Sequence, residues 1–476
     1  MWPQLTEKYY QKEAWPNPDV IKGLLPEQDD VFMVLYKELY YRHISTRLAP
    51  SLAQRVYSWE NYSDLFYHLL GAQSPNLELP VQWLWDIIDE FIYQYESWCQ
   101  YVSQLSDKTD EEINYLKENG TIWNVTSVIG YLEYLKAKSN IISWLNRGGE
   151  RGLVPEVEVA PDENGQFDFS QSETYRMLGY FCIIGQLRLH ALFRDYHLAL
   201  KVLAPIELSD QGLYARVPAC HVNLYYFLGF SYFMTRRYTD AVHAWVSILA
   251  MVEKQSARTA SDRQITRKTE RMFGLLAIAM SLCPCRIDET VDTKLREKYG
   301  EHMLRMGTGD EATYLEILQK NSPRQISPSP PNYDDKTDQH MQASEMQHRF
   351  FLNEVRQHAS LPSIRSYLRL YSTVELAKLA DYCQMDKEEF RTRLLALKHK
   401  SRMQCWQEGP AASGGEQQVG EVEFFIEKDV INVAEAKAKG QAHHADFFLH
   451  HIERLNSVSE DLGKQVAAQL SKGLGQ

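Results

Sequence analysis

The N-terminal part of the chain places apolar side chains at helical spacing among charged neighbours. Within residues 31–44 the recurring apolar positions are Val34, Leu35, Leu39 and Ile44. Residues 51–70 repeat the pattern, and neither stretch shows the sustained alternation of a half-buried strand. Pro80 suits the first turn of a further helix, because the amide hydrogen that proline lacks has no partner there anyway. The pattern predicts a helical region over residues 1–145.

Residues 82–95, QWLWDIIDEFIYQY, combine large apolar residues with Asp86, Asp89 and Glu90. On a helix these acids are close neighbours, whereas paired catalytic carboxylates of glycosidases face each other across a gap of about 5–10 Å. We therefore expect a solvated or partner-facing acidic strip and no catalytic pair. The side chains expected to pack on neighbouring helices are Trp83, Leu84, Ile88, Phe91 and Tyr95.

Residues 146–172, rich in Gly, Pro and acids, predict a loop or linker. Beyond it, residues 179–203 and 220–249 can be laid on each other with an offset of 42 residues. The alignment pairs Tyr196 with Tyr238 and Ala199 with Ala241. Each segment reads as a helix, a tight turn and a second helix, which is typical of tetratricopeptide-like repeats. We predict that residues 173–345 form such repeats, stacked as a right-handed solenoid.

A helix-turn-helix follows the repeats and a second, Pro- and Ser-rich loop. Ser372 is followed three residues later by Glu375, and Asp386 by Glu389. This is the spacing of a capping box, which marks the start of a helix. Gln384 lies in the short turn between the two predicted helices, so the pair reads as a helix-turn-helix.

A hairpin is predicted after the Gly-rich residues 408–420. The apolar positions that alternate there with glutamates are Val422, Phe424 and Ile426. A turn at Lys428 and Asp429 then leads into a second strand. A helix-turn-helix with a small hairpin predicts a winged helix over residues 346–440, and Phe424 and Ile426 are candidate subunit-interface residues.

The last segment, residues 441–476, is predicted to be one amphipathic helix. An isolated amphipathic helix is marginally stable in water and needs a surface to cover its apolar stripe. The candidate interface residues on this helix are Phe447, Phe448, Ile452, Leu455, Val458 and Leu462.

Composition bears on nucleic-acid binding. The 476 residues carry a formal net charge of −12, which disfavours a free-standing DNA-binding protein. A basic group nevertheless lies on or just after the second helix of the helix-turn-helix: Arg391, Arg393, Lys398, Lys400 and Arg402. Glu388 and Glu389 beside it would repel phosphates, which argues against sequence-specific DNA binding. Two interpretations of this group stay open: weak contact with RNA or the ribosome, and a solvated surface without a partner. A second basic group is Arg258, Arg263, Arg267, Lys268 and Arg271.

Signatures of catalysis, metal binding and membrane insertion are weak in this sequence. The seven cysteines form no CxxC pair, so no zinc site or cofactor is expected, and free thiols suit a reducing, cytoplasmic compartment. His443, Asp446 and His450 could share a helix face, but the two histidines would stand roughly 10 Å apart, too far for one ion. No nucleophile motif occurs, nor any apolar run long enough to span a membrane. We expect neither an enzyme nor a membrane protein.

Several long stretches rich in Trp and Tyr resemble the L subunits of eukaryotic translation initiation factor 3, a PCI-domain family. They are FMVLYKELYYRHI (32–44), LELPVQWLWDIIDEFIYQY (77–95), YRMLGYFCIIGQLRLH (175–190), LREKYGEHMLRM (295–306) and VEFFIEKDVINVAEAK (422–437). The order of helical repeats, winged helix and terminal helix is also that of a PCI domain. The resemblance runs along the whole chain.

The resemblance implies a non-catalytic scaffold subunit. PCI subunits assemble laterally through their winged helices, and their C-terminal helices join a shared bundle. The implied partners are other subunits of the factor, especially K and E, and the small ribosomal subunit, on which the complex helps assemble mRNA and initiator tRNA. Two alternatives stay open: a PCI subunit of the proteasome lid or COP9 signalosome, and a winged-helix nucleic-acid regulator.

Overall fold

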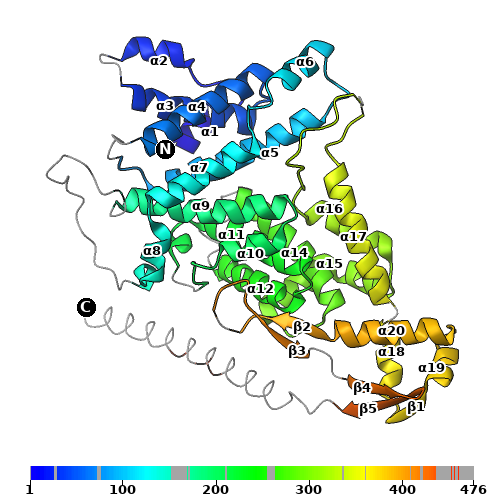
Figure 1. The fold of residues 1–476 in the computed structure, drawn as a ribbon. Coiled ribbons are helices and arrows are strands. Elements are labelled where there is room, and N and C mark those ends of the chain that lie inside the picture. Colours follow the sequence, from blue (N-terminus) through cyan, green and yellow to red (C-terminus); the bar gives the residue numbers. More distant parts are fainter. Residues whose placement is uncertain are drawn as a thin grey trace, which may run out of the picture. The chain divides into compact units, whose positions relative to one another are not determined.

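The computed structural model shows a mostly helical chain with short strands toward its C-terminal part (Figure 1). The structure describes residues 2–25, 29–71, 77–151, 172–208, 212–254, 263–334, 337–359, 361–407, 409–418 and 422–435, with the single positions Phe169, Ile452, Leu455 and Ser459. The chain divides into two compact units. Unit 1 comprises residues 1–356 and 404–415, and unit 2 comprises residues 357–403 and 416–476.

The N-terminal part of unit 1 is helical, as predicted. Its helices are α1 (Trp2–Tyr9), α2 (Pro18–Leu24), α3 (Asp30–Arg47), α4 (Leu52–Leu70), α5 (Val81–Ser103), α6 (Asp110–Glu118), α7 (Val125–Lys138) and α8 (Ile141–Asn146), followed by a 3₁₀ turn, η1 (Gly149–Arg151). Side chains fix several of the starts: Ser51 and Gln54 form a reciprocal capping box on α4. The predicted α5 is present, but Pro80 occupies its cap position, one residue before the first turn in which the sequence pattern placed it.

Phe91 of α5 lies at the centre of an aromatic cluster formed by α4, α5 and the segment before α7. Its ring centroid is 4.9 Å from that of Phe66, 5.1 Å from Tyr62 and 5.5 Å from Trp123. Phe91 and Phe66 are fully buried. The prediction that large apolar side chains of residues 82–95 pack on neighbouring helices is confirmed for this residue and for Leu84, Ile88 and Tyr95, all buried, while Trp83 is half-buried.

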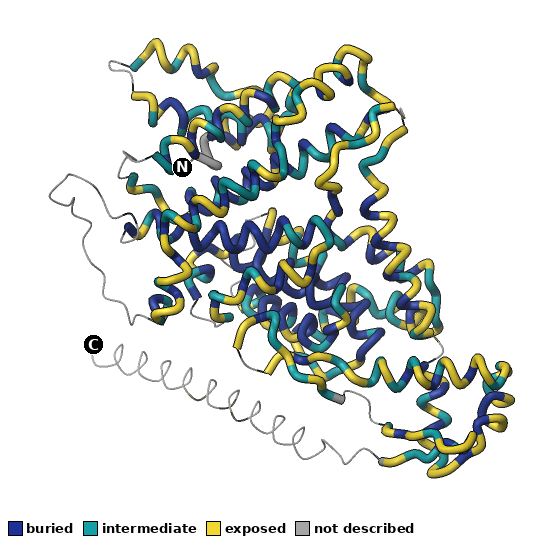
Figure 2. The backbone as a smooth tube through the Cα atoms, in the orientation of Figure 1, coloured by how far each residue is buried: buried dark blue, intermediate teal, exposed yellow. Residues whose placement is uncertain are grey.

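Unit 1 continues through helices packed as consecutive neighbours. They are α9 (Glu173–Leu192), α10 (Tyr196–Val202), the 3₁₀ turn η2 (Leu213–Arg216), α11 (Pro218–Met234), α12 (Tyr238–Lys254), α14 (Arg263–Leu282), α15 (Glu289–Gly307), α16 (Glu311–Asn321) and α17 (Gln342–Ala359). The middle of this set carries the most deeply buried backbone of the molecule (Figure 2). Its helices α9 and α11 are buried almost all round, which explains why they show little amphipathic pattern.

The predicted offset of 42 residues matches helix pair α9–α10 to helix pair α11–α12. Tyr196 and Tyr238 are the first residues of α10 and α12, and Ala199 and Ala241 are both fully buried. The turns correspond as well, because Arg194 (φ 69°) and Arg236 (φ 65°) both adopt the left-handed conformation. Two helix pairs thus share one local geometry.

Unit 2 contains α18 (Leu361–Leu368), α19 (Leu376–Tyr382) and α20 (Lys387–Lys400), with β1 (Thr373–Glu375), β4 (Val422–Glu427) and β5 (Val430–Glu435) in one antiparallel sheet of order β1-β5-β4. Strands β2 (Arg402–Cys405) and β3 (Gly415–Gln418) form a separate two-stranded sheet. The predicted hairpin is confirmed, and Lys428 and Asp429 turn it with positive φ angles of 45° and 68°.

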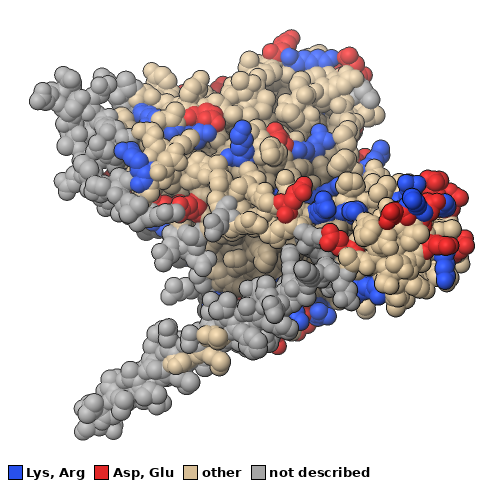
Figure 3. Space-filling view, turned by 60° about the horizontal axis from the view of Figure 1, so that its bottom comes forward, with Lys and Arg blue, Asp and Glu red and all other residues tan. Residues whose placement is uncertain are grey.

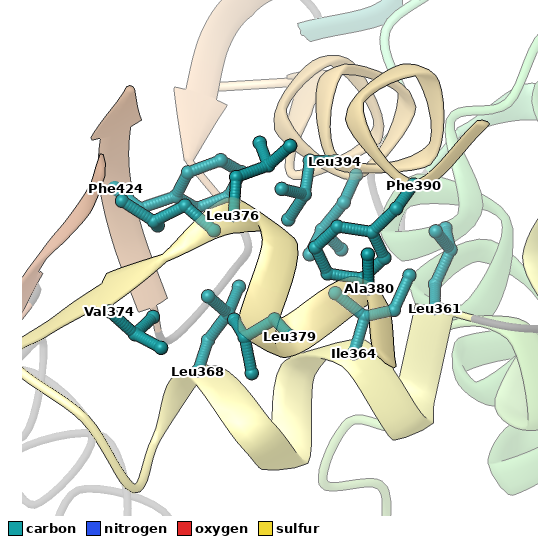
Figure 4. Packing of buried hydrophobic residues seen from close by; sticks show 12 residues of the cluster. Leu361, Ile364, Leu368, Val374, Leu376, Leu379, Ala380, Phe390, Leu394 and Phe424 are labelled. Atoms are coloured by element: carbon teal, nitrogen blue, oxygen red, sulfur yellow. The ribbon is translucent and has the colours of Figure 1, made fainter. Parts of the chain in front are cut away.

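The core of unit 2 lies between its helices and its sheet (Figure 4). Phe390 and Leu394 of α20 meet Leu376 and Leu379 of α19, and Phe424 of β4 closes the cluster. Helices α19 and α20, joined by a turn with Gln384 at φ 54°, form the predicted helix-turn-helix.

Neither of the two predicted capping boxes forms, although one of the two caps is present. Residues from Thr373 to Glu375 form β1, and α19 begins only at Leu376, so Ser372 caps no helix; its carbonyl instead accepts from the Val433 amide (2.8 Å). Tertiary pairing with β5 outweighed the local capping signal. The Asp386 cap is present, since its carboxylate accepts from the Glu388 amide (3.1 Å), but Glu389 pairs with Arg393 and does not complete a box.

Candidate interaction surfaces and buried ion pairs

The expected acidic strip on α5 is only partly solvated, because its acids pair with side chains of the protein itself. Asp86 accepts from the Arg42 guanidinium of α3 (3.3 Å), and Asp89 accepts from Arg188 of α9 (2.7 Å). Glu90 is 8 % exposed, and its carboxylate accepts from the Gln94 amide (3.0 Å). The sequence placed these acids correctly on one helix, but α3 and α9 cover that side of α5, which periodicity could not reveal.

The buried guanidinium of Arg188 joins three helices. Its second terminal nitrogen donates to Glu96 (3.0 Å), and Asn223 of α11 donates to the same Asp89 oxygen that Arg188 contacts (2.8 Å). A cation inside the apolar run GYFCIIGQLRLHAL is an available sequence signal, because lone charges in such runs need a buried partner. The cluster ties α5 to α9 and α11.

Burial also shifts the titration of the α5 acids. The pKa of Glu90 rises to about 8, chiefly because desolvation disfavours its charged form. Burial raises the pKa of Asp86 to about 6, although the nearby Arg42 guanidinium acts in the opposite direction. Within the described ranges neither acid faces a second carboxylate across an open cleft, so the geometry is that of a structural network.

A second buried arginine, Arg237, holds the segment that follows β2. Its Nε donates to Asp240 (2.7 Å), and its terminal nitrogens donate to the carbonyls of Ala411 (3.3 Å) and Ser413 (2.8 Å). Asp240 in turn accepts from the backbone amide of Trp406 (3.0 Å). In these hydrogen bonds the segment after β2 contributes only its backbone groups. We call this arrangement the Arg237–Asp240 clamp; it gives part of the predicted Gly-rich loop a defined place in unit 1.

The exposed side of β4 differs from the prediction. Phe424 is 4 % exposed and belongs to the core of unit 2, so its side chain is not at the surface. Ile426 is half-buried and packs against that same core. The exposed aromatic of this strand is Phe425, at 52 % exposure, which the alternating pattern could have assigned to the polar face. Strand β4 is the edge of its sheet in the part of the chain that the structure describes.

The basic group of α20 is only partly available. Lys398 donates to the Phe424 carbonyl (3.0 Å), and Arg393 is paired with Glu389 (2.8 Å). Lys400 is half-buried, while Arg391 and Arg402 are exposed. Acidic and basic side chains are interspersed over the visible face in Figure 3. The structure thus leaves two of the five residues fully on the surface.

The second basic group is similarly reduced. Arg258 lies outside the described residues, and Lys268 lies over the Phe227 ring (5.9 Å) with a pKa that burial lowers to about 8. Arg263 and Arg267 are exposed at the start of α14, and Arg271 is half-buried.

Most of the predicted terminal helix lies outside the described residues, including Phe447, Phe448, Val458 and Leu462, and so do His443, Asp446 and His450. Ile452 and Leu455 are helical and exposed, at 52 % and 67 %. Among the described residues no cluster of His, Cys, Asp or Glu has a metal-binding arrangement, and no helix there has the length and apolarity to cross a bilayer. The seven cysteines, all of them described, form no disulfide.

Comparison with known proteins shows similarity along nearly the whole chain. Residues 54–455 match a family model described as RNA polymerase I-associated factor PAF67. Subunit L of eukaryotic translation initiation factor 3 from Xenopus tropicalis is 42% identical over 472 residues, covering 97% of this chain and 82% of the relative. The human subunit L is 42% identical over 476 residues, covering 98% and 82%, and the mouse subunit L is 41% identical over the same length. This chain belongs to the family of subunit L of eukaryotic translation initiation factor 3.

Proposed function

We propose that the chain is a non-catalytic scaffold subunit of translation initiation factor 3. It assembles with sister PCI subunits, especially K and E, and in their company helps bring mRNA and initiator tRNA to the small ribosomal subunit. The observation that carries this proposal is identity above 40% with subunits L along nearly the whole chain. A cytoplasmic place of action follows from that role.

In this proposal, unit 2 is the winged-helix part of a PCI domain and the preceding helix pairs are its solenoid. The support is the order of elements: α18, β1, α19, α20 and the β4–β5 hairpin follow consecutive helix pairs. An edge strand can receive a strand from a neighbouring subunit, and β4 is such an edge in the described part of the chain. Phe425 is then the exposed aromatic that contacts the neighbour.

We propose two further contacts, one made by the terminal helix and one by the basic group of α20. The terminal helix, with Phe447, Phe448, Ile452, Leu455, Val458 and Leu462, is proposed to join the shared helical bundle. Weak RNA or ribosome contact is proposed for Arg391 and Arg402, because these two members of the α20 basic group are exposed.

Pull-down and gradient sedimentation test the scaffold role. The full chain, expressed with a tag in cells, should co-purify in constant ratio with the other subunits and comigrate with small ribosomal subunits. Phe425→Asp should weaken recovery of the neighbours, whereas Glu423→Gln on the same exposed face of β4 should not. A monomer that instead binds a defined duplex tightly, with a steep salt dependence, would point to a nucleic-acid regulator.

A second variant tests the terminal helix. Phe447→Asp combined with Leu455→Asp should release the subunit from the complex and leave the isolated chain folded, as judged by its circular dichroism and melting temperature. Normal co-purification of the double variant would remove this helix from the proposed anchor.

A further inference from the structure

A small pocket lies where α3, α4 and α5 meet, apart from the surfaces discussed above. Its cavity volume is about 10 Å³, roughly the room that one water molecule needs. Its lining residues are Tyr41, Ile44, Ser45, Pro50, Gln54, Arg55, Ser58, Gln94, Trp98 and Trp123. The pocket is partly open, so a group attached to a larger molecule can enter it.

Arg55 is the cation of this pocket, and it has no carboxylate partner in the described part of the chain. Its guanidinium lies over the Tyr101 ring (4.7 Å), and one terminal nitrogen donates to the Ser97 hydroxyl (2.8 Å). Its Nε is buried and makes no hydrogen bond. Among the described residues no acidic group lies within ion-pair distance of it. Desolvation lowers the pKa of Arg55, as expected for a partly buried cation without a counter-charge.

The buried arginines discussed above, unlike half-buried Arg55, each have a carboxylate partner. Arg42 pairs with Glu38 (2.6 Å), Arg188 with Asp89 (2.7 Å), and Arg237 with Asp240 (2.7 Å). Lys108, which shares the Tyr101 ring with Arg55, has Glu112 and two aspartates nearby that raise its pKa against the effect of desolvation. Arg55 is thus distinguished from these cations by the missing acid, in a chain that carries an excess of acids.

The pocket suits one oxygen of a carboxylate. The guanidinium of Arg55 brings a positive charge to the lining, and the hydroxyl of Tyr41, another lining residue, stays protonated at neutral pH because burial raises its pKa to about 12. Trp98 and Trp123 form apolar walls that exclude water and so strengthen an ion pair. A phosphate group presents more terminal oxygens than this space admits, and the net charge of −12 repels a polyanion.

We propose that this pocket receives the carboxylate of a glutamate or aspartate from a partner protein, which forms the ion pair that Arg55 lacks. The proposal rests on the proposed function for the existence of a partner, and it adds where one of its acidic side chains docks. A guanidinium and a carboxylate that become desolvated together are typical of residues that dominate an interface.

Binding measurements on the full chain and its purified sister subunits test the proposal. Arg55→Gln keeps a hydrogen-bond donor but removes the charge, and we expect the dissociation constant to increase at least tenfold. Arg47→Gln removes a charge from the exposed end of α3 nearby and should leave affinity unchanged. Melting temperatures of the isolated variants separate a loss of binding from a loss of folding.

Zero-length cross-linking supplies a second measurement that identifies the partner group. Arg55→Lys places a primary amine in the pocket and keeps the positive charge. With a carbodiimide, this amine should form an amide with the docked carboxylate, and mass spectrometry should find residue 55 joined to an aspartate or glutamate of a sister subunit.

The outcomes are distinct. Unchanged affinity for a folded Arg55→Gln together with no cross-link would overturn the proposal and leave a single water molecule as the occupant. A loss of affinity that appears only when RNA is present would replace the carboxylate by a nucleic-acid phosphate and overturn it too. Failure of the wild-type chain to bind any sister subunit would instead refute the proposed function.

Discussion

Arg237 and Asp240 form a buried ion pair of 2.7 Å that holds backbone groups far away in the sequence. Arg237 donates to the Ser413 carbonyl (2.8 Å), 176 residues further on, while Asp240 accepts from the Trp406 amide (3.0 Å). In the matching turn of the preceding helix pair, Asp195 instead caps α10 through the Leu198 amide (3.1 Å). The turn of the first helix pair thus carries a local helix cap, whereas the corresponding turn of the second pair carries the long-range Arg237–Asp240 clamp.

Removing the arginine of the clamp should destabilise unit 1. Arg237→Ala leaves Asp240 buried without its cation and several carbonyls without donors, a loss of about 3–5 kcal/mol. Urea denaturation measures this loss, and hydrogen exchange should accelerate at the Trp406 amide. The control, Arg305→Ala, breaks an exposed pair with Glu301 and should cost less than about 1 kcal/mol. An equal, small effect for both variants would show that the clamp contributes little.

The Arg188 cluster should behave as one coupled unit. Arg188→Met should destabilise the chain by about 3–5 kcal/mol, because Asp89 and Glu96 would both lose the buried guanidinium that pairs with them. Adding Asp89→Asn removes one of those charges, and the amide oxygen can still accept from Asn223. The double variant should thus be more stable than Arg188→Met alone. Additive losses in this double-mutant cycle would contradict the coupling.

Stability should fall as pH rises through the titration of Glu90. Its pKa is about 8 in the folded chain against an ordinary 4.5, so the folded state binds the proton more tightly than the unfolded state between these values. The free energy of unfolding then decreases from about pH 4.5 to about pH 8 as far as this group is concerned. Glu90→Gln removes the titration and should raise the melting temperature at pH 9 more than at pH 5. A shift independent of pH would refute the assignment.

Two glycines in helices should respond to alanine with opposite signs. In α11, a methyl group on Gly229 would clash with the buried Trp245 indole, so Gly229→Ala should cost about 1–3 kcal/mol. In α15, no atom lies within 4 Å of the position a methyl group would take on Gly300. Gly300→Ala should therefore stabilise the chain by up to about 1 kcal/mol through helix propensity. Thermal unfolding of the two single variants checks both signs.

Local patterns predicted much of the fold because they report local physics. The tight turns between α9 and α10 and between α11 and α12, the start of α5 after Pro80 and the hairpin turn at Lys428 and Asp429 are short-range features that local sequence indicated. The Ser372 cap failed because pairing of β1 with β5 involves residues about 60 positions apart, which no window around Ser372 contains.

Which apolar side chains of β4 reach the surface could not be predicted from the sequence pattern. Alternation placed Phe424 and Ile426 on the apolar side of β4, and that side packs on α19 and α20 within unit 2. Phe425 stands exposed on the other side. A pattern of period two separates the two faces of a strand, but it cannot say whether an apolar face meets its own core or a partner.

The sequence by itself determined the helices, the repeated helix pair, the helix-turn-helix with its hairpin, and the family, because all of these are written in spacing and in long aromatic motifs. Only the tertiary structure decided which charged side chains are solvated and which are buried and paired. Whether Asp89 is solvated or paired, whether Arg237 lies on a surface or in a clamp, and whether Arg55 has a counter-ion all depend on which helices cover one another. Burial sets the cost of a charge, and distant contacts set burial.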